Sequence, residues 1–466
     1  MATVNMIPLF VCMMRNNYVG KAVGVPFNTW NLYHRWAGRI VALESFAHMG
    51  AWTVNQVDHS NWAGVGVAIK GSLFFQMGLM AEIALFFLIF LSLSPLRHAH
   101  YQIFLATHQL CIAFFLVGAW LHCHIDELPH EKFVNIAIGI WAFERLHRLV
   151  TIYRKNVRLG KGWSLNSAEV KVAPAGEDAV RVSITMKKGW EFKPGQHAYL
   201  YVPRLSWTQS HPFSIAWSTT TPSLAEVQMQ PLEVSSTTSL AHRNLLTSKP
   251  RTTIHFVISR RHGFTGRLYR EAYKAAHSTD PEKVDIAPKR FLAFVEGPYC
   301  NEAHSFDSFS SLLFVAGGSG ITHPLGYIRH LLVASSEGLV AARRIKLAWV
   351  VRNSRNISWV SDWLEELWRL DARRGMLEVE IYVTRPCSQY DTDMSGGPRV
   401  KWFAGRPQME VILAGMLAPT RMRGGRGALA VNVCGPGSLA DNVRAAVRER
   451  VDEARIEFSE ESFTWS

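Results

Sequence analysis

Two apolar segments of the chain each carry a pair of histidines at one common spacing. His34 and His48 lie in the first segment, His108 and His122 lie in the second, and each pair is fourteen residues apart. In an α-helix, fourteen residues return to within about 40° of the starting face and advance about 21 Å along the axis. That advance is most of a hydrocarbon core about 30 Å thick. The pattern therefore predicts two neighbouring membrane helices that offer one histidine pair near each membrane face.

Imidazole is a common axial ligand of haem iron, and ionisable groups inside membrane helices tend to be functional. A lone histidine in an apolar helix is more often a polar contact between helices, but the repeated spacing favours ligands. We predict two b-type haems, one held by His34 and His108 and the other by His48 and His122. His124 competes with His122, but it lies sixteen residues from His108 and so points about 160° away from it.

Apolar runs dominate the chain as far as about Thr151 and predict an α-helical membrane bundle. We expect four spans, at about residues 30–52, 71–93, 101–123 and 132–152, after an apolar stretch at 1–14 that is too short to cross a bilayer. Lys and Arg gather in the loops on one side, so the positive-inside rule places the C-terminal part of the chain in the cytosol. The histidines His34 and His108 then lie near the cytosol, and His48 and His122 near the outside.

The net charge of +13 is spread along the chain without a long basic tract. We therefore predict no nucleic-acid binding, because the positive-inside rule and phosphate-bearing cofactors explain the basic residues better. The six cysteines form no CxxC motif, so the sequence signals neither a zinc site nor a disulfide framework.

The sequence pattern changes at about Trp163 to that of a soluble protein. Short alternating runs separated by turn residues predict an antiparallel β-barrel. From about Ser311, buried strands alternate with amphipathic helices, which predicts an α/β nucleotide-binding fold. The barrel strands are expected at Val180–Met186, Gln196–Val202 and Thr253–Ser259; the later strands at Ser311–Ala316, Ile345–Arg352, Leu377–Thr384 and Ala428–Val433; and the helices at Asp362–Arg373 and Leu439–Val451.

Four short motifs in this second part suit phosphate or flavin binding. Two are glycine-rich turns after predicted strands, where the backbone can approach phosphates and the next helix N-terminus favours anions. A third offers backbone amides, a hydroxyl and guanidinium groups for a pyrophosphate, and the fourth is polar and aromatic, with a simple turn as the alternative. These motifs are Gly317-Gly318-Ser319-Gly320-Ile321-Thr322; Cys434-Gly435-Pro436-Gly437, followed by a capping box of Ser438 and Asp441; Arg260-Arg261-His262-Gly263-Phe264-Thr265; and His211-Pro212-Phe213-Ser214.

Taken in order with the two histidine helices and the ending Glu461-Ser462-Phe463-Thr464-Trp465, these motifs resemble the ferric reductase and NADPH oxidase family, particularly the fungal ferric/cupric-chelate reductases. The resemblance implies that residues 211–214 hold the flavin of FAD and that residues 263–265 bind its pyrophosphate. It implies that residues 317–322 bind the NADPH phosphates, that Cys434 lies near the nicotinamide, and that Arg352 meets the adenosine 2′-phosphate. Trp465 resembles the terminal aromatic residue that covers the flavin ring.

The implied architecture is a membrane-helix remnant and loop at 1–29, a haem-binding bundle at 30–155, an antiparallel FAD barrel at 156–305 and a ferredoxin-reductase-like NADPH domain at 306–466. The implied function is a plasma-membrane reductase that passes electrons from cytosolic NADPH, through FAD and two haems, to external ferric or cupric chelates for metal uptake. The family core has six membrane helices, whereas four and a remnant are recognised here. The missing helices leave open a haem-less flavoprotein or scaffold. An NADPH oxidase that produces superoxide also stays open, because the choice of acceptor depends on the outer surface, where the sequence carries almost no signal.

The outer end of the second histidine helix suggests one further hypothesis. Cys123, His124, Asp126, Glu127 and His130 follow one another there and offer nitrogen, sulfur and carboxylate ligands. Such ligands suit copper and ferric iron. We expect this loop to be a transient landing site for the metal acceptor.

Overall fold

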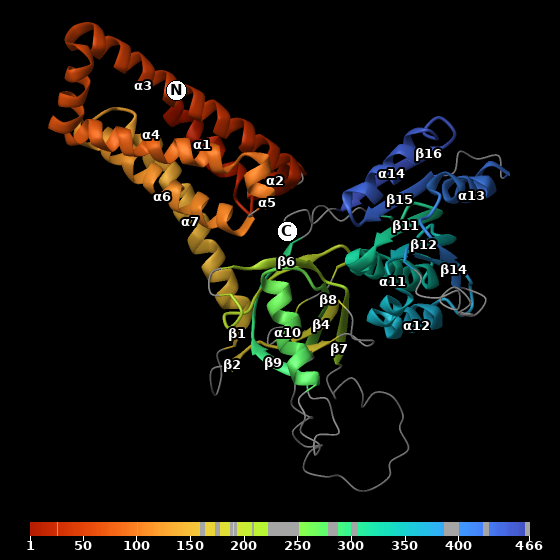
Figure 1. Ribbon diagram of the computed structural model, residues 1–466. Helices are drawn as coiled ribbons and strands as arrows, with labels where there is room; N and C mark the ends of the chain where they lie inside the picture. Colours follow the sequence, from red (N-terminus) through yellow and green to blue (C-terminus); the bar gives the residue numbers. More distant parts are fainter. Residues whose placement is uncertain are drawn as a thin grey trace. The chain divides into compact units, whose positions relative to one another are not determined.

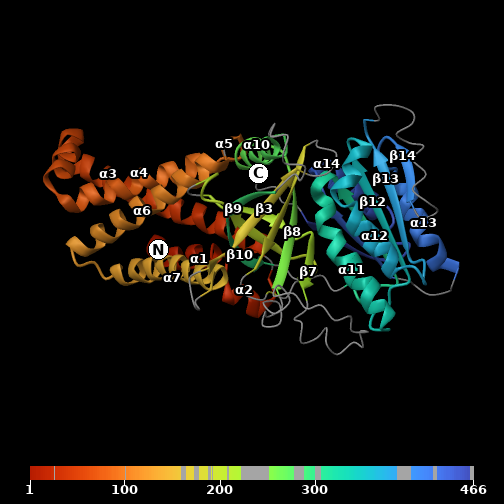
Figure 2. The same cartoon turned by 90° about the horizontal axis from the view of Figure 1, so that it is seen from below.

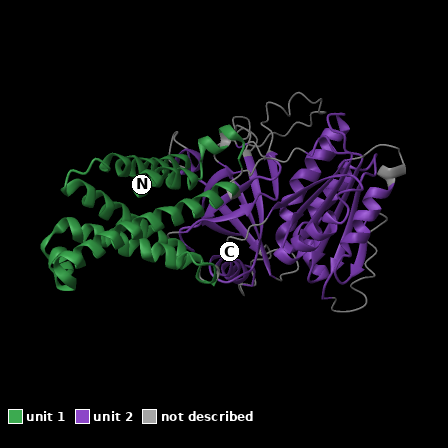
Figure 3. Cartoon of the chain, turned by 90° about the horizontal axis from the view of Figure 1, so that it is seen from above, with its two compact units in different colours: residues 1–151, 464–466 green, residues 152–463 purple. Residues whose placement is uncertain are grey.

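The chain divides into two compact units, one of residues 1–151 and one of residues 152–463 (Figure 3). The computed structural model describes residues 1–25, 27–99, 101–158, 164–172, 178–186, 190, 193–206, 209–221, 251–277, 288–299, 306–385, 400–422 and 428–461.

The first unit is a helical bundle (Figures 1 and 2). Small and apolar side chains on facing helices, among them Ala81, Leu85, Phe115 and Leu116, form its buried core. The last helix begins in the first unit and ends in the second. The helices are α1 (Ala2–Cys12), α2 (Tyr18–Val23), α3 (Phe27–Gly71), α4 (Leu73–Leu91), α5 (Ser94–Ala99), α6 (Tyr101–Ile125) and α7 (Glu131–Asn156).

The prediction of four membrane spans is confirmed only in part. Within the described residues, two helices are long and apolar enough to cross a membrane, α4 and α6. Helices also form at the other two predicted spans, in α3 and α7, but these helices are more polar. Charged residues explain the difference, because α3 carries Arg35, Arg39 and Glu44, while α7 carries Glu144 and neighbouring arginines. Some of these groups are paired within the bundle, as when Asn5 Nδ2 donates to both Glu44 carboxylate oxygens at 3.0 and 2.9 Å.

Helix α3 is interrupted well beyond its predicted span. Ser60 and Asn61 have non-helical backbone angles, and Asn61 has a positive φ of 56°. Asparagine tolerates this left-handed conformation better than most residues. The Asn61 side chain then accepts the Ala63 backbone N–H at 2.9 Å, as an N-cap does for a new helical segment. The segment that carries His34 and His48 therefore ends before this interruption.

The second unit begins with antiparallel strands that form two larger sheets, and their side chains share one core. One sheet has five strands in the order β7-β8-β4-β3-β9, and the other has three in the order β10-β5-β6. Helix α10 packs over the five-stranded sheet. The elements are β1 (Val157–Arg158), β2 (Ser164–Leu165), β3 (Ser167–Val172), β4 (Ala179–Thr185), β5 (His197–Tyr201), β6 (His211–Ser214), β7 (Trp217–Thr221), β8 (Arg251–Ser259), α10 (Phe264–Ala276), β9 (Lys289–Leu292) and β10 (Phe294–Tyr299).

The predicted single barrel is replaced by these two sheets, and strands that bend at corners connect them. Buried Ile215 and Ala216 separate β6 from β7. The Ile215 N–H donates to the carbonyl of Gln196, directly before β5, at 3.0 Å, whereas the Ala216 N–H donates to the carbonyl of His255 in β8 of the other sheet at 2.9 Å. Ala293 separates β9 from β10 in the same way. Strands that switch sheets at bends are a known way to close such a sandwich.

The rest of the second unit is a six-stranded parallel sheet with helices on both faces (Figure 1). One core packs α11 and α12 against the sheet, and another packs α13 and α14 against the opposite face. The elements are β11 (Ser311–Gly317), the 3-10 turn η1 (Gly318–Ile321), α11 (Thr322–Ser336), β12 (Arg344–Val351), the 3-10 turn η2 (Ser354–Trp359), α12 (Ser361–Leu370), β13 (Leu377–Val383), β14 (Val400–Ala404), α13 (Met409–Met422), β15 (Ala428–Cys434), α14 (Gly437–Arg448) and β16 (Arg455–Glu461).

The strand order of this sheet is β14-β13-β12-β11-β15-β16. The chain builds outward from β11 in one direction and then returns to the other side of β11 with β15. The order therefore reverses between β11 and β15, and ligands of open α/β sheets bind outside the carboxyl ends of the strands at such a switch point. Both predicted glycine-rich turns follow these two strands.

Candidate functional sites

The outer pair of predicted ligands is brought together in the first unit. The ring centres of His48 and His122 lie 6.5 Å apart. Two imidazoles that bind one metal from opposite sides, each through a nitrogen about 2 Å away, have centres roughly 6 Å apart. His122 Nδ1 lies 2.9 Å from the Phe74 carbonyl oxygen. A carbonyl only accepts, so Nδ1 carries the hydrogen and Nε2 is left with a lone pair for a metal.

The inner pair has a matching environment. His34 Nδ1 donates to the Leu9 carbonyl at 3.2 Å, which again leaves Nε2 with a lone pair. His108 Nδ1 is buried and has no hydrogen-bond partner among the described residues. These donors fit axial ligation of haem iron, the group that the spacing predicts.

Helix α4 supports the outer pair through two residues that the sequence reasoning missed. The Phe74 ring stacks on His122 with centres 3.9 Å apart and planes 24° apart. A Cβ on Gly78 would lie 2.8 Å from His122 Nδ1, so only glycine leaves room for the ring. Phe74 and Gly78 are four residues apart and share one helix face. In the sequence, the only available signal of this contact was a single glycine, Gly78, among large apolar residues.

The segment from Cys123 to His130 does not gather the residues of the predicted landing site. Cys123 is buried, and His124 lies against Glu131, with Nδ1 3.2 Å from Oε1. The His124 ring also stacks on Trp120 at 4.9 Å. Within the described chain, no group of three or more His, Cys, Asp or Glu side chains could hold a metal ion. The landing-site hypothesis is therefore wrong for this structure: Cys123 and His124 lie in α6, whereas Asp126, Glu127 and His130 lie in the turn after it, and they form no metal-binding group.

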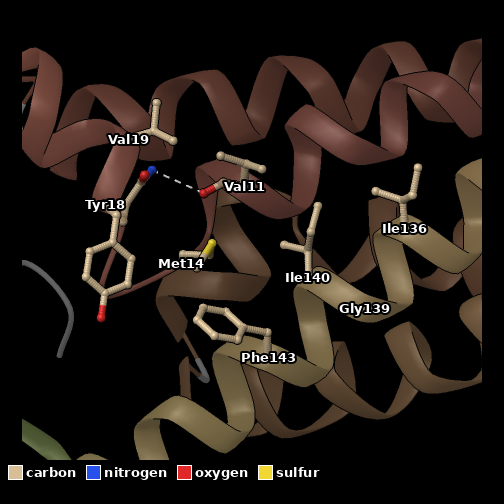
Figure 4. Close-up of a pocket in the computed structure, with 9 residues that line it drawn as sticks. Val11, Met14, Tyr18, Val19, Ile136, Gly139, Ile140 and Phe143 are labelled. Carbon is tan, nitrogen blue, oxygen red and sulfur yellow. Dashed lines mark hydrogen bonds between the residues drawn. The ribbon is translucent and has the colours of Figure 1, made fainter.

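An apolar pocket of about 400 Å³ lies between the α1–α2 segment and α7 (Figure 4). Its walls include Val11, Met14, Ile140 and Phe143. The nearby Asn17 side chain donates to the Val11 carbonyl at 3.1 Å. The lining contains no histidine, cysteine, carboxylate, lysine or arginine side chain.

The predicted flavin motif is a strand, β6, and not a turn. His211 stacks on Phe264 with ring centres 4.6 Å apart, and Phe213 lies 6.4 Å from the same ring. The structure thus joins the motif at 211–214 to the motif at 263–265. Burial, with a smaller contribution from Arg267, lowers the pKa of His211 to about 4, so the ring is neutral near pH 7. Its Nε2 atom is buried and has no hydrogen-bond partner in the described chain, which suits a bound ligand.

The pyrophosphate motif forms the start of α10. Gly263 is the N-cap with a φ of 74°, and no side chain caps the helix. Backbone N–H groups at such a helix start attract anions. The Thr265 hydroxyl accepts the Arg261 backbone N–H at 3.0 Å, which holds the turn closed. The Arg260 guanidinium lies 5.0 Å from the centre of the Tyr269 ring, so this cation stays beside the helix start.

The two glycine-rich turns of the nucleotide part touch each other. A Cβ on Gly320 would overlap the Cys434 carbonyl oxygen, and one on Gly317 would lie 2.6 Å from Pro436 Cδ. These two glycines therefore allow the two turns to pack together. The sequence analysis explained them differently, by a close approach of the backbone to phosphate. Gly318, by contrast, has a φ of 55° and open space where a Cβ would be. Gly318 and Ser319 are thus the residues of the motif best placed to face a ligand.

Hydrogen bonds hold the first turn in this conformation. Trp349 Nε1, which sequence reasoning missed, donates to the Gly318 carbonyl at 2.9 Å. The Thr322 hydroxyl donates to the Ser319 carbonyl at 3.0 Å. Ile321 is fully buried below the turn. The predicted capping box after the second turn is wrong, because α14 begins at Gly437 with Pro436 as its N-cap and no side-chain cap.

The remaining predicted residues lie at the same edge or outside the described chain. Burial, reinforced by Glu461, raises the pKa of the Cys434 thiol to about 12, so it is neutral at physiological pH. Gly435 approaches Gly317 so closely that a Cβ on Gly435 would lie 3.0 Å from the Gly317 nitrogen. Arg352 is exposed directly after β12, the neighbour of β11. Trp465 lies outside the described residues.

Three family models match the chain in succession. A ferric reductase like transmembrane component matches residues 1–119, a FAD-binding domain matches residues 163–303, and a ferric reductase NAD binding domain matches residues 309–448. The first contains three of the four predicted haem ligands and ends three residues before His122, the second contains both flavin motifs, and the third contains both glycine-rich turns.

Curated relatives match the chain along nearly its whole length. Ferric/cupric reductase transmembrane component 1 of Candida albicans is 24% identical over 99% of this chain and 56% of its own length. Ferric reductase transmembrane component 6 of Saccharomyces cerevisiae is 24% identical over 98% of this chain and 58% of its own length. The chain thus spans a little over half the length of these relatives.

A solved ferredoxin reductase of carbazole 1,9a-dioxygenase aligns with 63% of this chain and 68% of its own, at 17% identity and a TM-score of 0.37, which is too low to support an argument. The family models, their order and the relatives agree with the predicted resemblance. The chain is a membrane protein with a FAD-binding and a nicotinamide-nucleotide-binding domain, and along nearly its whole length it is similar to fungal ferric and cupric reductases.

Proposed function

We propose that the chain is a transmembrane ferric-chelate reductase, with cytosolic NADPH as the electron donor, FAD and two b-type haems as the carriers, and an external ferric or cupric chelate as the acceptor. The observation that carries this proposal is the His48–His122 pair, whose rings lie 6.5 Å apart on two neighbouring helices. The names of the fungal relatives supply the metal substrate. Bound FAD would supply the exchange of a hydride for single electrons, which haem iron can carry.

In the first unit, we assign His34 and His108 to the inner haem and His48 and His122 to the outer one. Two histidines on each iron leave no open position for a substrate, so each pair suits electron transfer. The Leu9 and Phe74 carbonyls orient His34 and His122 through their Nδ1 hydrogens. We place the protein in the plasma membrane as a multi-pass protein, with its flavin and nucleotide domains in the cytosol.

In the second unit, we assign residues 211–214 to the flavin and residues 260–265 to its pyrophosphate. The neutral His211 ring can donate or accept one hydrogen bond without adding charge beside the flavin. Residues 317–322, Gly435 and Pro436 would hold NADPH at the switch point between β11 and β15. Cys434 would contact the nicotinamide as a neutral thiol, and Arg352 would bind the 2′-phosphate.

The test is a reduced-minus-oxidised spectrum of membranes from cells that express the chain, together with ferric-chelate reduction by the same cells. We expect a b-type band, and we expect His108→Ala to lower it and to abolish chelate reduction. His124→Ala is the matched control, because this histidine lies on the same helix with its ring against Trp120. Chelate reduction that survives His108→Ala would contradict the proposal, and superoxide production without chelate reduction would favour the oxidase.

A further inference from the structure

Four side chains, two tryptophans between two arginines, form a stack where the antiparallel strands of the second unit meet the helices of the parallel-sheet part. The Arg181 guanidinium lies 4.2 Å from the centre of the Trp363 ring. Trp363 stacks on Trp217 with centres 5.7 Å apart and planes 8° apart. The Arg329 guanidinium also contacts this pair, 4.6 Å from the centre of the Trp217 ring. We call this set the arginine–tryptophan stack.

Both ends of the arginine–tryptophan stack are anchored across the same boundary. From β4, Arg181 donates to both carboxylate oxygens of Asp362 in α12, at 3.0 and 2.5 Å, and to the Trp359 carbonyl at 2.8 Å. From α11, Arg329 donates to the Ser218 carbonyl in β7 at 2.9 Å. Each arginine therefore binds a partner on the opposite side of the boundary.

The stack is part of a continuous buried core. Trp217 is 1% exposed and Trp363 is 5% exposed. Ala216, Trp217 and Val257 of the strands belong to the same buried cluster as the helices α11 and α12. Contacts between domains of one chain are usually more polar and allow movement. Here a shared core, two cation–π contacts and paired charges oppose such movement.

The stack is also connected closely to both candidate cofactor sites. Trp217 begins β7, three residues after Ser214 of the flavin motif, and only the Ile215–Ala216 corner lies between them. Arg329 lies on α11, seven residues after Thr322, the last residue of the glycine-rich motif. A shift at the stack would therefore move the strand that carries one motif relative to the helix that carries the other.

We propose that Arg181, Trp217, Arg329 and Trp363 are positioning residues that set the distance between the flavin and the nicotinamide for hydride transfer. Hydride transfer needs the two reacting atoms about 3–3.5 Å apart, and a misplacement of about 1 Å can slow a reaction about a hundredfold. The flavin and the nicotinamide would be bound by separate parts of the chain, so contacts between those parts must fix their relative position. This inference rests on the proposed use of NADPH and FAD.

The test compares the full-length holoenzyme with Arg181→Ala, with Arg329→Met and with the double variant. The matched control is Arg369→Ala, which removes an arginine of α12 whose ion pair, with Glu365, is exposed and stays within that helix. Anaerobic stopped-flow spectroscopy measures flavin reduction by NADPH. We expect each single variant to slow reduction about tenfold or more, with FAD content and the KM for NADPH changed less than twofold. Arg181→Lys, which keeps the charge but loses the planar fork, should recover part of the rate.

A second measurement follows the boundary itself without cofactor chemistry. Calorimetry should show the second unit unfolding in one transition in the parent and in Arg369→Ala, and in two in the double variant. Unchanged reduction rates together with an unchanged single transition would overturn the inference. A rate that falls only in proportion to lost FAD would reduce the stack to a structural role and overturn it as well. If the parent shows no NADPH-dependent flavin reduction, the proposed function fails instead, and calorimetry alone then decides whether the stack joins the two parts.

Discussion

Two half-buried histidines, His211 and His255, make the second unit sensitive to acid. Burial lowers the pKa of His255 to about 4, with a further contribution from Arg181, and it lowers that of His211 to about 4 as well. His255 is satisfied as a neutral ring, because its two nitrogens lie 2.8 Å from the Ser183 hydroxyl and 3.2 Å from the Thr219 hydroxyl. Folding therefore favours the neutral form of both rings.

This preference predicts a loss of stability on acidification. An unfolded histidine takes up its proton near pH 6.5, whereas these two take it up only near pH 4 when the protein is folded. The unfolded state thus binds more protons between these values, so stability falls as the pH is lowered through that window and is independent of both rings above it. The slope is up to about 1.4 kcal/mol per pH unit for each ring. His255→Gln should flatten the decline in melting temperature of the purified protein, and the exposed His262→Gln should not.

The proposed role of Arg352 predicts that the enzyme prefers NADPH to NADH. Its side chain is exposed after β12, at the strand edge that carries the glycine-rich turns. A charge-assisted hydrogen bond to a 2′-phosphate is worth roughly 1.5–3 kcal/mol. Arg352→Ala should therefore raise the KM for NADPH about tenfold to a hundredfold and leave the KM for NADH nearly unchanged. Equal effects on both nucleotides in steady-state assays would assign the 2′-phosphate to another residue.

At the scale of elements, α4 and α6 depend on one point of close approach. A Cβ on Gly118 would lie 2.8 Å from the Met77 carbonyl oxygen and 2.9 Å from the Ala81 nitrogen. Both atoms are backbone, so the helices must separate to accept a methyl group. Overpacking of this kind costs about 1–3 kcal/mol. His122 lies one turn beyond Gly118 on the same helix, so separation of the helices also moves a predicted haem ligand.

Gly118→Ala should therefore lower both the melting temperature and the haem content of detergent-solubilised protein. Gly139→Ala in α7 is the control, because open space surrounds the position of its Cβ. That variant should be neutral or slightly stabilising, since alanine favours helix by up to about 1 kcal/mol over glycine. Haem spectra and thermal unfolding measure both effects. Equal behaviour of the two variants would show that the close approach of α4 and α6 is not required.

The sequence predicted the elements whose patterns are local. The strand at Ser311–Ala316 and the helix at Leu439–Val451 were recognised to within a few residues of β11 and α14, because a buried apolar run and helical periodicity are visible in a short window. Strand β16 escaped recognition, because Arg455–Glu461 is rich in charge and belongs to the sheet only through its pairing with β15. The corner at Ile215–Ala216 escaped for a similar reason, since hydrogen bonds to residues far along the chain define it.

In the candidate sites, too, some features could be predicted from the sequence and others depend on the folded structure. The histidine spacing predicted the His48–His122 approach, because helix geometry turns spacing into direction. The roles of Phe74 and Gly78 depend on how α4 packs on α6, which no spacing within one helix reveals. The arginine–tryptophan stack joins residues from four separate elements, and Arg181 is 181 residues away from its partner Asp362 in α12. Only the folded chain brings them together.

At the scale of the whole molecule, the proposed binding sites for NADPH and FAD lie in one unit, and the proposed haem ligands lie in the other. Residues 152–463 contain the motifs for FAD and the nucleotide, and residues 1–151 contain all four predicted haem ligands. Flavin reduction should therefore depend on the second unit alone, whereas chelate reduction should need both. The two half-reactions can be separated in one full-length protein by point substitutions.

We predict that His48→Ala and His122→Ala leave the rate of flavin reduction by NADPH within about twofold of the parent and abolish reduction of an external ferric chelate. The physical reason is that each imidazole would be one of the two histidine ligands of a bound haem, so the loss of either would remove the bis-histidine ligation. Gly318→Val should instead impair the first half-reaction, the reduction of the flavin by NADPH. The positive φ of 55° at this position is strained for a β-branched residue. NADPH binding and flavin reduction should therefore fall, while the haem content is retained. Stopped-flow spectra of flavin and haem measure both steps in each variant. If His122→Ala still reduced the chelate at the parent rate, electrons would leave from the flavin directly, and the haem-less flavoprotein would be the correct description of this chain.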